Sequence, residues 1–198
     1  MSSLPLLIEK QASDLPEGAL LHPKALLHLG NRAAIDQALS RLARSGRLLR
    51  VCQGVYVHPV ETRFGSRPPA IDKVVASLSA LWGETITPCG GAEANALGLT
   101  TQVPVRSVYL TSGPDRRLKF GEVTVELRHA PRWQLVAPHR PAGRAVRALA
   151  WLGREEIEPN LEVVERRLSK EDIDELAETR AVLPAWIAEP VSALIASA

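Results

Sequence analysis

Apolar residues recur every three or four positions through the first 45 residues, a spacing that predicts helices. Three helices are expected, over residues 4–13, 23–29 and 32–45. Gly30 ends the second of them, and Asn31 is a good N-cap for the third because its side chain accepts from a free backbone N–H. The third helix is expected to bury one apolar stripe, formed by Ile35, Ala38, Leu39 and Leu42.

After Gly46 the pattern changes from helical spacing to alternation, which predicts a short antiparallel hairpin. Its strands are expected at residues 48–51 and 55–58. Three helices followed by a two-stranded wing are the element order of a winged helix-turn-helix. Residues 1–62 are therefore predicted to form such a DNA-binding domain. Residues 63–69, which are rich in proline, glycine and arginine, are expected to be a linker.

The rest of the chain, residues 70–198, mixes strands with helices and predicts an α+β domain that ends in helices. The expected strands are 84–88, 106–111, 117–120, 122–129 and 133–136. The expected helices are 70–82, 92–99, 142–154, 159–168, 169–179 and 182–196. The fold class expected for the whole chain is thus α+β, an N-terminal winged helix-turn-helix followed by a mixed α/β C-terminal domain.

Charge is unevenly spread along the chain, although the total is only +2. Residues 1–67 carry nine Lys or Arg against five Asp or Glu, a net +4, and residues 101–150 carry nine against three, a net +6. Residues 151–198 carry five against eleven, a net −6. The two basic blocks predict an anionic partner for the front and the middle of the chain.

No stretch approaches the roughly 18 apolar residues of a membrane span, and the N-terminus lacks a signal-peptide pattern. A cytoplasmic protein with no membrane contact is expected. The two cysteines, Cys52 and Cys89, have no metal-ligand spacing and are expected to be reduced thiols. Neither a metal nor a cofactor is expected.

The outer face of the third helix carries residue types that read DNA. Arginine donates a two-pronged hydrogen bond to guanine or phosphate, and glutamine pairs with adenine. Arginines beside the first wing strand would contact phosphates. The alternative is a basic face used only for contact with a protein. The residues predicted to bind DNA are Arg32, Gln37, Ser40, Arg41, Arg44, Arg47 and Arg50.

A second basic patch, formed by Arg116, Arg117 and Lys119, lies in or beside a predicted hairpin. It would suit RNA, DNA or an acidic partner, and the acidic C-terminal helices of the same chain are one such partner. A solvated turn with no binding role is the alternative.

An enzymatic interpretation rests on Asp115, Glu126 and Arg128, whose order resembles the acidic–acidic–lysine order of nucleases that bind Mg²⁺. Arginine cannot deprotonate to act as a base, and Asp115 lies in a turn where aspartate is common for backbone reasons. Gly90 and Gly91 precede a helix as in a phosphate-binding loop, but no P-loop lysine follows. The chain is therefore expected not to be an enzyme. A metal-dependent nuclease and a ligand-sensing winged-helix repressor remain alternatives.

Four segments together resemble one family: residues 37–42 (QALSRL), the wing 50–56 (RVCQGVY), residues 90–99 (GGAEANALGL) and the strand 107–111. Their order over residues 15–140 resembles the AbiEi-type antitoxins of type IV toxin–antitoxin (abortive infection) systems. The resemblance implies a winged helix-turn-helix and a C-terminal antitoxin domain. It places DNA contact at Arg32, Gln37, Arg41, Arg44, Arg47 and Arg50.

The same resemblance implies two tasks. One is repression of the protein's own operon through an inverted repeat in the operator DNA, bound by monomers or a weak dimer. The other is neutralisation of a nucleotidyltransferase-type toxin encoded in that operon, which need not involve stable contact. No compact motif marks the residues that would oppose the toxin.

Overall fold

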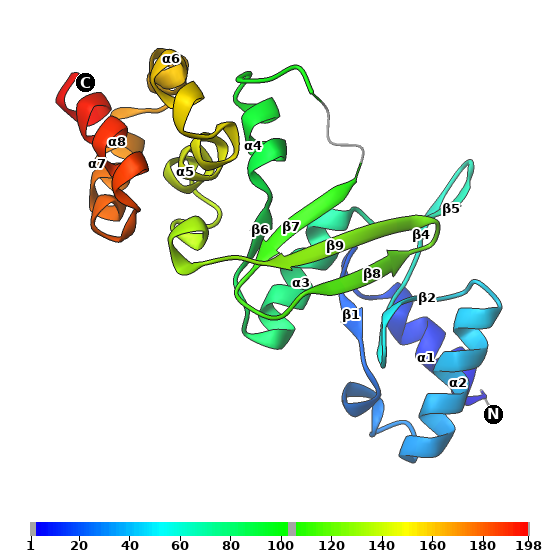
Figure 1. Cartoon of the computed structure of the whole chain (residues 1–198). Helices are drawn as coiled ribbons and strands as arrows, with labels where there is room; N and C mark the ends of the chain where they lie inside the picture. The colour runs from blue at the N-terminus through cyan, green and yellow to red at the C-terminus, as the bar shows by residue number, and fades with distance from the viewer. Residues whose placement is uncertain (1–2, 103–105, 198) are drawn as a thin grey trace. The chain divides into compact units, whose positions relative to one another are not determined.

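A computed structural model describes residues 3–102 and 106–197. The chain divides into two compact units. The N-terminal unit comprises residues 1–84 and 117–125, and the C-terminal unit comprises residues 85–116 and 126–198. Both contain helices and strands, so the predicted α+β class is confirmed (Figure 1).

The N-terminal unit begins with α1 (Leu4–Ser13) and α2 (Arg32–Arg44), as predicted. Asn31 caps α2, with its Oδ1 accepting from the Ala34 backbone N–H at 2.9 Å. The prediction of an α-helix over residues 23–29 is wrong, because this stretch forms only the single 3-10 turn η1 (Pro23–Leu26). The backbone hydrogen bonds here span three residues, from the Ala25 N–H to the His22 carbonyl at 3.0 Å and from the Leu29 N–H to the Leu26 carbonyl at 2.8 Å.

The predicted wing is present as β2 (Leu49–Cys52) and β3 (Val55–Val57). A two-residue strand that the pattern did not predict, β1 (Leu20–Leu21), pairs antiparallel with β3 and completes a sheet of order β1-β3-β2. Two residues are too few to show alternation. The core between this sheet and the helices contains Ile8, Leu21, Leu26, Ile35, Leu39, Leu42, Leu48 and Tyr56.

The stretch expected to be a linker is instead part of a second hairpin, β4 (Val60–Thr62) paired with β5 (Gly65–Arg67). Its end is fixed by Glu17, which accepts from the Arg67 guanidinium at 3.1 Å, from the Ala70 backbone N–H at 3.0 Å and from Lys73 Nζ at 2.6 Å. The last two donors belong to the start of α3 (Ile71–Trp82), a helix predicted correctly. A carboxylate from a distant loop therefore orders a segment whose composition favours a linker.

The strands that follow are β6 (Ile86–Pro88), β7 (Ser107–Thr111), β8 (Arg116–Phe120) and β9 (Val123–His129), in the sheet order β6-β7-β9-β8. Each lies within a residue or two of its predicted position. The strand expected over residues 133–136 is wrong, because this stretch forms the 3-10 turn η2 (Arg132–Leu135). Pro131 starts that turn, and its carbonyl accepts from the Gln134 backbone N–H at 3.0 Å.

The C-terminal unit is mainly helical, and Ser169 and Asp172, three residues apart, form a capping box. The helix expected from residue 159 begins five residues earlier, after Gly153, and Pro159 lies inside it. None of the helices described is long and apolar enough to cross a membrane. The helices are α4 (Gly90–Ala96), α5 (Pro141–Leu152), α6 (Arg154–Glu165), α7 (Lys170–Thr179), the 3-10 turn η3 (Arg180–Val182) and α8 (Ala185–Ser197).

Candidate nucleic-acid interface

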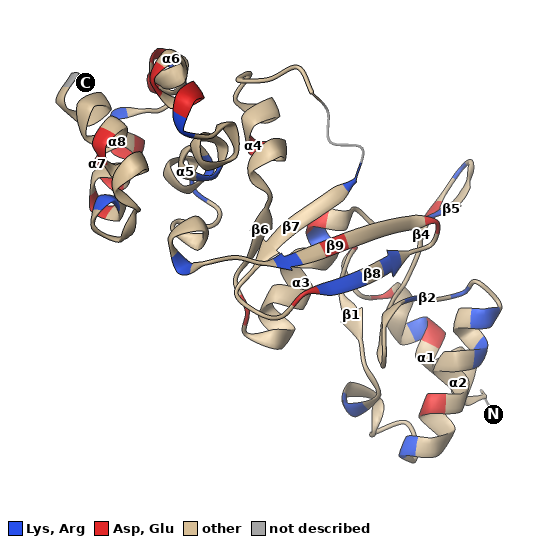
Figure 2. Cartoon of the chain, in the orientation of Figure 1, with Lys and Arg blue, Asp and Glu red and all other residues tan. Residues whose placement is uncertain are grey.

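The outer face of α2 is the first candidate site. The four predicted inward residues of α2 are buried, so the opposite side of the helix faces solvent. Gln37, Arg41 and Arg44 follow one another at spacings of four and three residues. Gln37 and Arg41 are exposed, as is Arg32 at the helix start, while Ser40 is half-buried. Figure 2 shows the basic residues along α2. The face carries arginine and glutamine, the residue types that hydrogen-bond to base edges in a DNA groove.

The cations of this face differ in how they are held. The Arg44 guanidinium donates to Ser40 Oγ at 3.2 Å, and Arg32 Nε pairs with the Asp36 carboxylate at 2.8 Å. Within the described part of the chain, no carboxylate pairs with Arg41. The Arg44–Ser40 and Arg32–Asp36 contacts are exposed to solvent. Such contacts are weak enough for the arginines to exchange them for phosphates.

Arg47 and Arg50, the two predicted DNA contacts at the wing, differ in their interactions within the protein. Arg47 forms an ion pair with Glu9 of α1, so its charge is partly neutralised within the N-terminal unit. Arg50 remains exposed on β2 and makes a 3.4 Å hydrogen bond to the Cys52 carbonyl. Gly54, with φ of +72°, allows the tight turn that joins the wing strands. Arg50 is thus the more available cation of the two.

The second basic patch lies on a strand. Along β8, Leu118 and Phe120 are buried, whereas Arg117 and Lys119 point to solvent and Arg116 is half-buried. The strand therefore presents two lysine or arginine side chains on one face. Figure 2 shows the basic colouring of β8.

The residues of the nuclease alternative have partners of their own. Asp115 Oδ1 accepts from the His129 backbone N–H at 2.6 Å, which holds the turn before β8. The Glu126 carboxylate pairs with Arg128 at 2.8 Å and with Arg106 at 3.6 Å, and the Glu126 pairing raises the pKa of Arg128. Among the residues described, no group of three or more His, Cys, Asp or Glu side chains converges as metal ligands do.

A largely buried charge cluster, formed by Glu93 of α4 with Arg147 and the exposed Arg144 of α5, is absent from the sequence-based predictions. Glu93 accepts from Arg144 Nε at 2.8 Å and from Arg147 Nη2 at 2.9 Å. The Arg147 side chain is fully buried, and burial lowers its pKa while the Glu93 carboxylate opposes that shift. The same guanidinium donates to the Pro138 carbonyl at 3.0 Å. The sequence signal was an arginine flanked by apolar residues (AVRALA) in a helix expected to pack inward.

Gly90 and Gly91 serve this packing and not a phosphate. A Cβ added at Gly90 would lie 2.3 Å from the Arg147 carbonyl oxygen, and one at Gly91 would lie 3.0 Å from the Trp151 ring nitrogen. Only glycine lets α4 approach α5 this closely. The close packing of α4 against α5 therefore explains why both positions are glycine, without a phosphate-binding role.

Residues 7–176 match the sequence profile of a family of unknown function, DUF6088. The chain belongs to DUF6088. No curated protein matches it significantly. Among solved structures it resembles the crystal structure of RV2827C protein from Mycobacterium tuberculosis, with a TM-score of 0.54, 18% sequence identity, and coverage of 100% of this chain and 78% of that one. At this identity the likeness supports the α+β fold alone. The DUF6088 match spans both the outer face of α2 and the largely buried charge cluster.

Proposed function

We propose that this DUF6088 protein is a DNA-binding, antitoxin-like transcriptional autorepressor. The observation that carries the proposal is the row Gln37, Arg41 and Arg44 on the outer side of a capped helix, with the β2–β3 wing in the same unit. The N-terminal unit holds twelve Lys or Arg against eight Asp or Glu, a net +4, while the C-terminal unit holds twelve against fourteen. An excess of cations beside such a helix suits a polyanion.

The mechanism follows from the two elements. α2 would enter the major groove, where Gln37 and Arg41 meet base edges, and Arg44 and Arg50 would bind phosphates beside it. Two copies would occupy the half-sites of an inverted repeat, as monomers or as a weak dimer. Operator binding would take place in the cytoplasm and needs neither metal nor cofactor.

The antitoxin half of the proposal rests on the resemblance to AbiEi-type antitoxins. The C-terminal unit would neutralise a nucleotidyltransferase-type toxin encoded beside this protein, which need not involve stable contact. Co-expression tests this: the wild-type chain is expected to restore the growth of cells that carry the toxin. Continued growth arrest would refute the antitoxin role and leave DNA binding standing.

The DNA-binding half is tested by the double variant Arg41→Ala/Arg44→Ala in a gel-shift titration with DNA from upstream of the gene. Removing two such side chains is expected to weaken operator binding by roughly 30-fold or more. The slope of log affinity against log salt should become shallower by about 1 for each arginine that no longer binds a phosphate. The matched control is Arg154→Ala/Arg166→Ala on α6, which removes the same charge from the C-terminal unit. Equal affinity of wild type and the α2 variant would refute this interface.

A further inference from the structure

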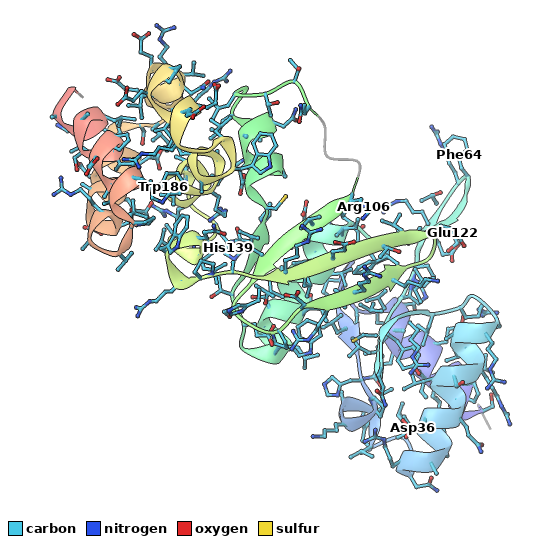
Figure 3. All side chains as sticks on the ribbon, viewed as in Figure 1. Asp36, Phe64, Arg106, Glu122, His139 and Trp186 are labelled. Atoms are coloured by element: carbon cyan, nitrogen blue, oxygen red, sulfur yellow. The ribbon has the colours of Figure 1, made fainter. Side chains whose placement is uncertain are left out.

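The tip of the β4–β5 hairpin presents an aromatic side chain to solvent. Phe64 is 86% exposed, more than any other large apolar residue described, and it lies at the two-residue turn between Thr62 and Gly65. Figure 3 shows Phe64 at the end of the hairpin, pointing away from the protein. Residues 61–67 are all exposed, so this side chain adds nothing to the core.

Hydrogen bonds order the backbone of the tip. Thr62 Oγ1 donates to the Gly65 carbonyl at 2.7 Å and accepts from the Phe64 backbone N–H at 3.2 Å. Gly65 has φ of +111°, which an L residue rarely adopts. The other end of the hairpin is fixed by the Glu17 carboxylate through Arg67. An exposed phenylalanine on an ordered backbone is preorganised for binding, because less conformational freedom is lost when a ligand receives it.

Arg63 adds a cation to the same tip. Its guanidinium carbon lies 4.6 Å from the centre of the Phe64 ring, in a cation–π contact. A ligand that receives Phe64 must therefore also receive a positive charge beside it. An apolar protein groove would have to desolvate that charge at a cost, whereas a DNA groove offers negative potential and stacked rings together.

We infer that the Arg63–Phe64 tip is a wedge for duplex DNA. This rests on the proposed function, and it adds a second DNA-contacting element to the N-terminal unit. Phe64 would enter the minor groove and partly unstack one base step, while Arg63 would lie along the groove. Such a wedge kinks the duplex and binds with little regard to sequence, so α2 supplies specificity and the tip supplies affinity and bending.

The test compares Phe64→Ala and Phe64→Trp on the full chain, with duplex DNA from upstream of the gene and an unrelated duplex as probes. Phe64→Ala is expected to weaken binding to both duplexes by about 10-fold, the loss of one aromatic–base stack. It should also abolish the DNA bend measured by end-to-end energy transfer, and the fluorescence rise of a 2-aminopurine placed at the wedged step. Phe64→Trp should retain all three. The matched control is Val182→Ala, another exposed apolar residue in the C-terminal unit.

The outcomes separate this inference from the proposed function. If Arg41→Ala/Arg44→Ala abolishes binding while Phe64→Ala changes neither affinity nor bend, the wedge is refuted and α2 remains the DNA reader. If Phe64→Ala leaves DNA binding intact but abolishes binding of the toxin, the tip is a protein-docking site and the wedge is likewise refuted. If neither variant alters DNA binding, both proposals fall.

Discussion

Arg41 of α2 and Arg147 of α5 are arginines in opposite environments, one exposed to solvent and one buried. On α2, Arg41 is exposed, and Arg44 makes only a weak contact with a serine hydroxyl. On α5, Arg147 is fully buried and is bound by Glu93 and by backbone carbonyls. Charge counted along the sequence treats the two helices alike. Arg147 is inaccessible to a partner because it is buried, whereas Arg41 is accessible.

In the basic block 101–150, as in the block 1–67, several cations are paired with carboxylates of their own unit. Arg144, Arg147 and Arg128 of the later block are all paired with carboxylates of the C-terminal unit. Of these pairs, Arg147–Glu93 is the fully buried one, and a buried pair carries a desolvation cost that its attraction only roughly repays. The predictions that follow test each side of this contrast, beginning with the largest expected effect.

Glu93→Ala should give the largest loss of stability. The substitution leaves the buried Arg147 guanidinium without its counterion, which costs about 3–5 kcal/mol in free energy of unfolding. Urea unfolding followed by circular dichroism measures this. The double variant Glu93→Leu/Arg147→Met removes both charges and should recover most of the loss. A cost under about 1 kcal/mol for Glu93→Ala would contradict the assignment of a buried pair.

Gly90→Ala should destabilise through the same contact of α4 with α5. Its Cβ would meet the Arg147 carbonyl oxygen at 2.3 Å, and because that atom is backbone, a cost of about 1–3 kcal/mol is expected. Gly83→Ala is the control: Gly83 has φ of +66° but nothing within 4 Å of an added Cβ. That change should cost only local strain, about 1 kcal/mol. Equal losses of unfolding free energy in Gly90→Ala and Gly83→Ala would show that the steric contact at Gly90 is unimportant.

Acid should loosen the hairpin that carries the proposed wedge. Hydrogen bonds from Lys73 and from the Ala70 backbone, with a smaller contribution from Arg67, lower the pKa of Glu17 to about 2 from its ordinary 4.5. The unfolded chain therefore takes up this proton first as pH falls below 4.5. The stability that Glu17 contributes is fully present above that pH and is lost as pH falls toward 2.

Glu17→Gln should accordingly flatten the decline in urea midpoint between about pH 6 and about pH 3. Glu61→Gln, which alters an exposed carboxylate of the same hairpin, serves as the control. An unchanged acid dependence in Glu17→Gln would show that this carboxylate is not held as described.

Asp36→Asn should have the smallest effect, a gain in DNA affinity. It removes a negative charge from α2 and releases Arg32, which is expected to tighten binding by about threefold at low salt. High salt should erase the gain. Glu162→Gln is the matched control, because Glu162 forms the same type of exposed pair with Arg166 on α6. Weaker binding in Asp36→Asn would mean that the pair positions Arg32 productively.

The elements with strong periodicity were predictable from the sequence. α2 and its cap, the wing, α3 and the capping box at Ser169 all follow from local patterns, because the spacing of apolar residues and the capping chemistry are properties of a few neighbouring residues. The outward placement of Gln37, Arg41 and Arg44 follows from the same spacing. The DNA role assigned to them stays a prediction.

The predictions that were wrong concern stretches whose structure depends on residues distant in sequence. Glu17 orders the hairpin at Val60–Thr62 and Gly65–Arg67 from more than 40 positions away, and β1 exists only because β3 offers it a partner. Local composition in these stretches favoured a linker and a loop.

By itself, the sequence determined the α+β class, the capped α2 helix and the wing, since local periodicity and capping fix these. Only the tertiary structure decided which arginines are available to a partner. Arg41 and Arg147 have the same charge and similar helical surroundings in sequence. Their difference arises because Glu93, 54 positions from Arg147, neutralises one of them inside the protein and nothing comparable covers the other within the described residues. Burial of a charge depends on long-range packing, which no local pattern records.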